Sequence, residues 1–244
     1  RTGNKFFNLG RTGVRSILFR NVNGIFNAGQ TAKLTFNNAA LIVSDQNTFP
    51  GIDVARFGEN INTIADRATF EGTSVIGQID GACTMFERYY SVETIEGARR
   101  TTHYSIPYEA FREAVANAVA HRTWDVNAKI RIAMRPDHIE ISSPGGLPAG
   151  LGRDEYLRGF ISQLRNPILA NVLFRLNIIE MFGTGIVRIR SSYAQYEQKP
   201  EFDVSENAVR VTLPVTDAKP ALTSDEELVY QFVKEEGSAA SGQI

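Results

Sequence analysis

Residues 113–121 read EAVANAVAH and place three polar side chains, Glu113, Asn117 and His121, four residues apart in a run of alanine and valine. On an α-helix this spacing aligns the three side chains in one stripe. Because the intervening residues are small and apolar, such a helix packs closely against neighbours over most of its surface. A partly buried carboxylate, amide and imidazole need partners, since each polar group buried without one costs roughly 1–3 kcal/mol. The stripe therefore indicates a site for a polar ligand or an ion, with an exposed helix face as the alternative.

Two glycine clusters follow this helix in positions expected for loops. The first is Gly145-Gly146, and the second is Gly183-Thr184-Gly185, which precedes a run with apolar residues at helical spacing. Glycine lets a backbone approach a ligand closely. The N–H groups of the second cluster would lie at a helix N-terminus, which favours anions such as phosphate. For each cluster a tight turn with a helix cap is the alternative interpretation.

Alternation of polar and apolar residues predicts two strand pairs in the second half of the chain. Residues 129–134 alternate, residues 136–137 favour a turn, and residues 138–142 return, which together predict a β-hairpin. A second pair is predicted over residues 201–204 and 208–213.

The first half of the chain has a different pattern. A short helix is predicted over residues 35–43 and a strand over residues 52–57, after a Pro-Gly turn. Residues 73–90 carry apolar side chains at steps of three and four, which predicts a helix of about five turns. Helices covering one face of a mainly antiparallel or mixed sheet would make an α+β fold, a two-layer sandwich.

The order of these features resembles that of a known superfamily: a Glu-x-x-x-Asn helix, a strand pair, a Gly-Gly loop, a connecting segment and a Gly-x-Gly helix start. It resembles the ATPases of gyrase, heat-shock chaperones, histidine kinases and mismatch-repair proteins. More narrowly, residues 106–122, 135–146, 164–171 and 182–186 resemble the RecG-like C-terminal domain of bacterial transcriptional regulators. This resemblance covers about half of the chain and implies a histidine-kinase-ATPase-like fold, with residues 148–165 in the place of the nucleotide lid.

The resemblance also implies roles for individual residues. In the superfamily the helix glutamate activates the attacking water and the asparagine helps to hold magnesium against the phosphates, so Glu113 would be catalytic and Asn117 would be the metal ligand. The implied cofactors are ATP and Mg²⁺. The residues that would contact the nucleotide are Asn117, His121, Ser143, Gly145, Gly146, Gly183, Thr184 and Gly185.

The first glycine motif departs from the superfamily pattern. That motif normally begins with an aspartate that accepts a hydrogen bond from the adenine amino group, whereas here Ser143 or Ser142 precedes Pro144. A serine hydroxyl can accept the same hydrogen bond, but it lacks the charge that makes the usual contact roughly twice as strong.

Composition bounds the class of protein. With 244 residues, 43% hydrophobic and 22% charged, the chain is globular and long enough for one large or two smaller cores. Cys83 is the only cysteine, which excludes an intramolecular disulfide and a zinc-finger or iron–sulfur cluster and fits a cytoplasmic location. No apolar run approaches the roughly 20 residues that cross a bilayer, so no membrane partner is expected.

The charge balance argues against a self-sufficient nucleic-acid-binding domain. The formal net charge is -1, without the basic surface that such domains show. Any contact with DNA is therefore expected from regions outside this chain. Residues 225–234 resemble the first helix of a winged-helix DNA reader whose recognition helix would follow residue 244. An amphipathic helix that docks on its own domain is the alternative.

These patterns predict four segments. Residues 1–30 would be a remnant of, or linker from, an N-terminal domain, residues 31–100 an α/β lead-in subdomain, residues 101–218 the ATPase-like domain, and residues 219–244 the start of a truncated winged-helix domain. The expected function is a ligand-sensing, adenine-nucleotide-binding module of a bacterial DNA-binding transcriptional regulator. A degenerate, nucleotide-free dimerisation scaffold is the alternative.

Catalysis is expected to be limited. The sequence has no phosphate loop or paired motor domains, which argues against a helicase and leaves at most a slow ATPase. The identity of the effector, the DNA target and whether the chain forms a homodimer stay open.

Overall fold

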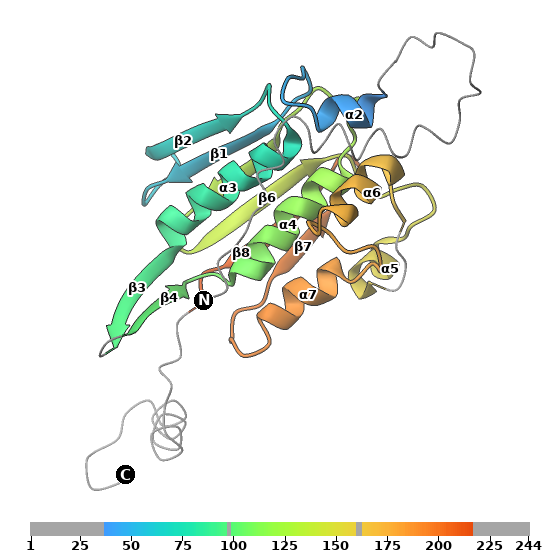
Figure 1. The fold of residues 1–244 in the computed structure, drawn as a ribbon. Helices are drawn as coiled ribbons and strands as arrows, with labels where there is room; N and C mark the ends of the chain where they lie inside the picture. The colour runs from blue at the N-terminus through green and yellow to red at the C-terminus, as the bar shows by residue number, and fades with distance from the viewer. Residues whose placement is uncertain (1–36, 97–98, 160–162, 217–244) are drawn as a thin grey trace, which may run out of the picture.

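Six strands form one mixed sheet in the computed structural model, which describes residues 37–96, 99–159 and 163–216 (Figure 1). The strand order across the sheet is β2 (Ile64–Phe70), β1 (Ile52–Phe57), β5 (Ile130–Met134), β6 (His138–Pro144), β8 (Ala208–Pro214) and β7 (Glu201–Val204). Strand β1 runs parallel to β5, and the other neighbours are antiparallel. The two predicted strand pairs are confirmed as β5–β6 and β8–β7.

Each strand turns one set of side chains toward the helices and the alternate set away from them. On β5, Ile130, Ile132 and Met134 are buried, whereas Arg131 is exposed. This follows from the pleat, because successive side chains of a strand point to opposite faces. The sheet thus has one face packed into the core and one face that the described helices leave uncovered.

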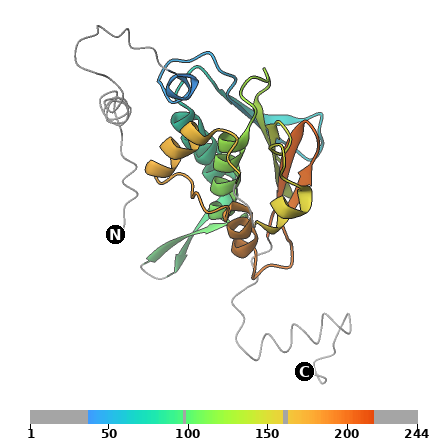
Figure 2. The same cartoon turned by 90° about the vertical axis from the view of Figure 1, so that its right-hand side faces the viewer.

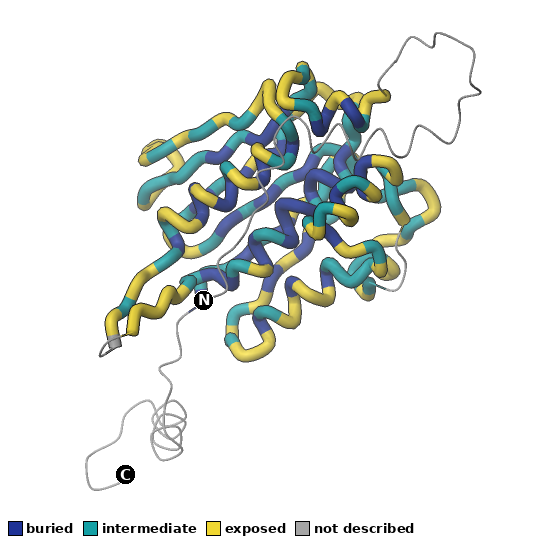
Figure 3. The backbone as a smooth tube through the Cα atoms, viewed as in Figure 1, coloured by how far each residue is buried: buried dark blue, intermediate teal, exposed yellow. Residues whose placement is uncertain are grey.

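The larger helices lie on the packed face of the sheet (Figure 2). They are α3 (Val75–Tyr90), α4 (Tyr108–His121), α6 (Pro167–Arg175) and α7 (Gly185–Ser192), with the short helices α2 (Asn38–Ile42) and α5 (Arg153–Arg158) beside them. Helix α4 contacts α3, α6, α7, β6 and β8, and its alanines and valines are buried nearly all round (Figure 3). The expected α+β fold of helices on a mainly antiparallel sheet is confirmed.

The helix predicted over residues 73–90 is confirmed as α3. The helix begins at Val75 because the Ser74 side chain accepts a hydrogen bond from the Ile76 N–H, which makes Ser74 the N-cap. The residues that set its helical spacing, Val75, Ile79, Cys83, Phe86 and Tyr90, are all buried. The predicted short helix is present as α2, while residues 35 and 36 of that prediction lie outside the described residues.

Some elements did not follow from the sequence. Strand β2 and the hairpin of β3 (Ser91–Glu96) with β4 (Arg99–Tyr104) were not predicted, and the hairpin projects away from the sheet (Figure 1). β3 and β4 carry mainly polar, exposed side chains, so they lack the alternating pattern of a half-buried strand.

The six-stranded sheet contains strands from two of the four predicted segments. Strand β1 from segment 31–100 pairs with β5 from segment 101–218, so both segments contribute to one sheet. Segments 1–30 and 219–244, including the helix predicted over residues 225–234, lie outside the described residues. Within the described part of the chain, no helix combines the length and apolarity needed to cross a membrane.

Candidate functional site

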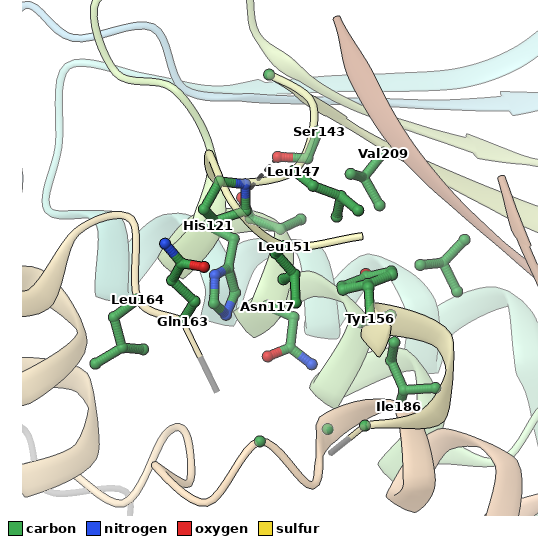
Figure 4. A pocket seen from close by; sticks show the side chains of 18 of the residues that line it. Asn117, His121, Ser143, Leu147, Leu151, Tyr156, Gln163, Leu164, Ile186 and Val209 are labelled. Carbon is green, nitrogen blue, oxygen red and sulfur yellow. Dashed lines mark hydrogen bonds between the residues drawn. The ribbon is translucent and has the colours of Figure 1, made fainter. Parts of the chain in front are cut away.

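A pocket lies between the second half of α4, the end of β6 and the segments that carry α5 and α7 (Figure 4). Helix α4 contributes Asn117 and His121, and β6 contributes Ser143. The enclosed volume is about 90 Å³, several times the roughly 10–15 Å³ that one water molecule requires. Its glycine lining is Gly145, Gly146, Gly159, Gly183 and Gly185, and its apolar lining includes Leu147, Leu151, Tyr156, Leu164, Ile186 and Val209.

Two of the three polar side chains of α4 line this pocket, and the third is buried between α4 and α7. Asn117 and His121 line the pocket, whereas Glu113 is only 3% exposed and is not part of the lining. The Asn117 Nδ2 donates to Glu113 Oε1 over 3.2 Å. Among the described residues nothing donates to Asn117 Oδ1, so this oxygen is available to a cation.

Gly185 is the residue that brings α7 against this stripe. A Cβ atom at Gly185 would clash with the Asn117 amide and would lie 2.9 Å from Glu113 Oε1. Glycine therefore lets the first turn of α7 lie this close to Glu113 and Asn117 without displacing the ends of their side chains. Gly183 has a φ of 70°, a backbone conformation that favours glycine.

Thr184 supplies an unpaired hydroxyl at the same place. It is the N-cap residue of α7, yet its side chain forms no capping hydrogen bond. Its Oγ1 is buried and, within the described part of the chain, has no hydrogen-bond partner. Thr184 does not itself line the pocket, although Gly183 and Gly185 on either side of it do. The hydroxyl and the free N–H groups of the first helical turn suit an anion.

Strand alternation decides between the two serines that precede the first glycine cluster. Ser143 faces the helices and lines the pocket, whereas Ser142 lies on the opposite face of the sheet. The Ser143 hydroxyl donates to the Ala118 carbonyl of α4 over 2.8 Å. Its oxygen lone pairs can still accept a hydrogen bond from a ligand amino group.

His121 provides a neutral polar group inside the pocket. Burial, together with the positive charge of Arg165, lowers the pKa of His121 below its usual value of 6.5. At neutral pH the imidazole therefore offers one donor and one acceptor nitrogen. Figure 4 shows its ring beside Gln163, on the same side of the pocket as Asn117.

Arg165 and Asn166 hold the parts of the site together, a role that the sequence pattern did not predict. Arg165 Nη2 donates to the Gly146 carbonyl over 2.7 Å. Asn166 Nδ2 donates to the carbonyls of Ala120 and Arg122 over 2.9 and 2.8 Å, which satisfies the end of α4. The available signal was the Asn-Pro pair, since proline is common at the first position of a helix.

The donor set fits magnesium better than a transition metal. Among residues 37–96, 99–159 and 163–216, no three histidine, cysteine, aspartate or glutamate side chains gather as metal ligands. Magnesium is usually bound through one or two protein oxygens, with phosphate and water completing its shell. Asn117 Oδ1 is an oxygen of this kind beside the unpaired Thr184 hydroxyl at the start of α7, so the residues present are compatible with magnesium and a phosphate.

Comparison with known proteins finds a family match for part of the chain. Residues 127–213 match the family model described as "Putative ATP-dependent DNA helicase recG C-terminal". The match supports this domain family. It spans β5 to β8 with α5, α6 and α7, and so includes both glycine clusters, whereas α4 with Glu113 and Asn117 precedes it. No curated protein sequence matches the chain closely enough to count as a relative.

A solved structure shares the fold. The crystal structure of the DIP2311 protein from Corynebacterium diphtheriae superposes with a TM-score of 0.62 at 23% sequence identity. The match covers 73% of this chain but 37% of that protein, so the chain spans little more than a third of its length.

Proposed function

We propose that the pocket binds an adenine nucleotide with Mg²⁺ and that the chain is the ligand-sensing module of a bacterial DNA-binding transcriptional regulator. One observation carries the proposal: the Asn117 amide meets the glycine-bounded start of α7, where the Thr184 hydroxyl is buried and unpaired. The match of residues 127–213 to an ATPase-like family supports nucleotide binding.

Each part of the pocket has a role in this proposal. The phosphates would lie at Gly183 and Gly185, which line the pocket on either side of the buried Thr184 hydroxyl, because the N–H groups at the start of α7 favour an anion. The base would lie toward Ser143 and His121, which offer hydrogen-bond acceptors and donors. Asn117 Oδ1 would hold Mg²⁺, which supplies positive charge between the phosphates and the buried Glu113 carboxylate. Without that cation the carboxylate would repel the phosphates, so binding should require magnesium.

The Asn117→Ala variant should lose nucleotide binding without unfolding. The wild-type chain is expected to bind ATP with a Kd on the order of 10–1000 μM in the presence of Mg²⁺, as measured by calorimetry with ATP, ADP and AMP. Asn171→Ala is the matched control, because it removes an exposed asparagine from α6. If nucleotides at millimolar concentration give no heat and leave the Tm unchanged, the dimerisation scaffold becomes the better reading.

If the chain is part of a transcriptional regulator, sequence-specific DNA binding should require residues outside 1–244. Residues 1–244 carry a net charge of -1, so this chain alone should bind duplex DNA only without sequence preference. A protein extended beyond residue 244 should bind its promoter tightly, with an affinity that falls steeply as salt rises. A mobility-shift series at two salt concentrations compares the two, and sequence-selective binding by residues 1–244 alone would contradict the proposal.

A further inference from the structure

The uncovered face of the sheet contains a second hollow, across the sheet from the nucleotide pocket. Its volume is about 330 Å³, within the lower range of small-molecule sites. Small side chains, Ala55, Ala133 and Ser142, contribute to it. The charged side chains around it are Asp53, Arg67, Arg131, Arg135, Glu140 and Arg210.

Strand register places two of these arginines on either side of Ser142. Arg131 on β5 lies opposite Ser142 on β6, and Ser142 lies opposite Arg210 on β8. Neighbouring strands are separated by about 4.8 Å, so the Cα atoms of the two arginines lie roughly 10 Å apart. Both side chains are long enough to converge over the Ser142 hydroxyl between them.

The acidic groups nearby leave these two arginines unpaired. Asp53 accepts from Arg67 Nη2 and Nε over 2.7 and 3.2 Å and from Thr69 Oγ1 over 2.8 Å. The hydrogen bond from Arg67 is the main reason why the pKa of Asp53 lies below its usual value. The charge of the Asp53 carboxylate is therefore already balanced by Arg67 on the neighbouring strand.

The other charged side chains at the hollow contact groups other than Arg131 and Arg210. Glu140 lies 3.6 Å from His138 Nε2, and the Arg135 guanidinium lies 5.1 Å from the centre of the Phe57 ring. Asp203 is opposite Arg210 on β7, yet no ion pair joins them. Within the described residues, neither Arg131 nor Arg210 has an ion-pair partner, so the centre of the hollow carries excess positive charge.

We propose that this hollow binds the phosphate group of a small phosphate monoester between Arg131 and Arg210, with Ser142 donating to it. Two guanidinium groups can each present a pair of N–H donors to phosphate oxygens, and the serine hydroxyl can bond a third oxygen. The alanines leave space for the organic part of the ligand. Glu140, which also lines the hollow, and Asp203, which lies opposite Arg210, interrupt the positive charge, so this face lacks the continuous positive groove that a nucleic-acid backbone requires.

Calorimetry of the full chain at low salt tests the site with glucose 6-phosphate and inorganic phosphate as probes. The wild-type chain should bind glucose 6-phosphate, and the R131A/R210A double variant should bind it at least 10-fold more weakly. Arg175→Ala is the control, because it removes an exposed arginine from α6 on the other side of the sheet. Asn117→Ala should leave glucose 6-phosphate binding unchanged, which separates this site from the nucleotide pocket.

A second variant tests the geometry while both arginines remain. Ser142→Glu places a carboxylate between the two guanidinium groups and should also weaken binding at least 10-fold. The proposal is overturned if the wild-type chain binds neither probe or if the double variant binds as the wild type does. Succinate binding as tight as that of glucose 6-phosphate would overturn the assignment to phosphate. Binding of single-stranded DNA through Arg131 and Arg210, without binding of the small probes, would assign the face to nucleic acid instead.

Discussion

The Arg122→Ala variant should lose roughly 3–5 kcal/mol of stability, enough to lower the Tm by roughly 10 °C. Arg122 is completely buried just after α4 and donates to the carbonyls of Pro50, Val126 and Ala128. Its guanidinium lies 4.3 Å from the centre of the Trp124 ring. Burial lowers the pKa of Arg122 to about 10, so the group is still charged at neutral pH. Removing it leaves a cavity beside the tryptophan and takes the donor from the carbonyls of Pro50 and Ala128, whereas the Val126 carbonyl still accepts from the Ala128 N–H.

Denaturant unfolding of two matched variants separates these contributions. Arg122→Met keeps much of the packing volume but removes every donor, so it isolates the cost of the unpaired carbonyls. Arg153→Ala removes an exposed arginine from α5 and should change stability by less than about 0.5 kcal/mol. An Arg122→Ala variant as stable as Arg153→Ala would show that water or a rearranged loop satisfies the carbonyls.

The Glu113→Gln variant should lower ATP turnover by roughly 100-fold or more while nucleotide binding persists. This expectation rests on the proposed function. Glutamine has nearly the same shape and can still accept the hydrogen bond from Asn117 Nδ2, but it cannot take a proton from water. Glu113 lies beside Asn117 and the first turn of α7, where the phosphates would lie.

Steady-state hydrolysis and calorimetry on the same protein preparations provide the two measurements. Glu109→Gln is the matched control, since Glu109 lies one turn earlier on α4 and is exposed. It should hydrolyse ATP at the wild-type rate. Equal turnover in wild type and Glu113→Gln would instead give Glu113 a structural role, that of a buried carboxylate at the N-terminal end of α7, which helix dipoles favour.

The α4 stripe shows how far the candidate site follows from sequence. The spacing of Glu113, Asn117 and His121 predicts one helix face, and Asn117 and His121 do share the pocket. Glu113 lies outside the pocket lining because α7 crosses α4 at Gly185 and covers it. That crossing joins residues far apart in the chain, so no local spacing contains it.

Several elements of the fold follow from patterns that are local in the sequence. Period-two alternation specified β5–β6 and β8–β7, and steps of three and four residues specified α3 and α4, because side-chain direction repeats with the backbone geometry of each element. The pairing of β1 with β5, the anchoring of Gly146 by Arg165, and the register of Arg131 and Arg210 on either side of Ser142 are visible only in the folded chain. Register and packing between distant segments depend on the burial of the whole core, and no short stretch of residues encodes that burial.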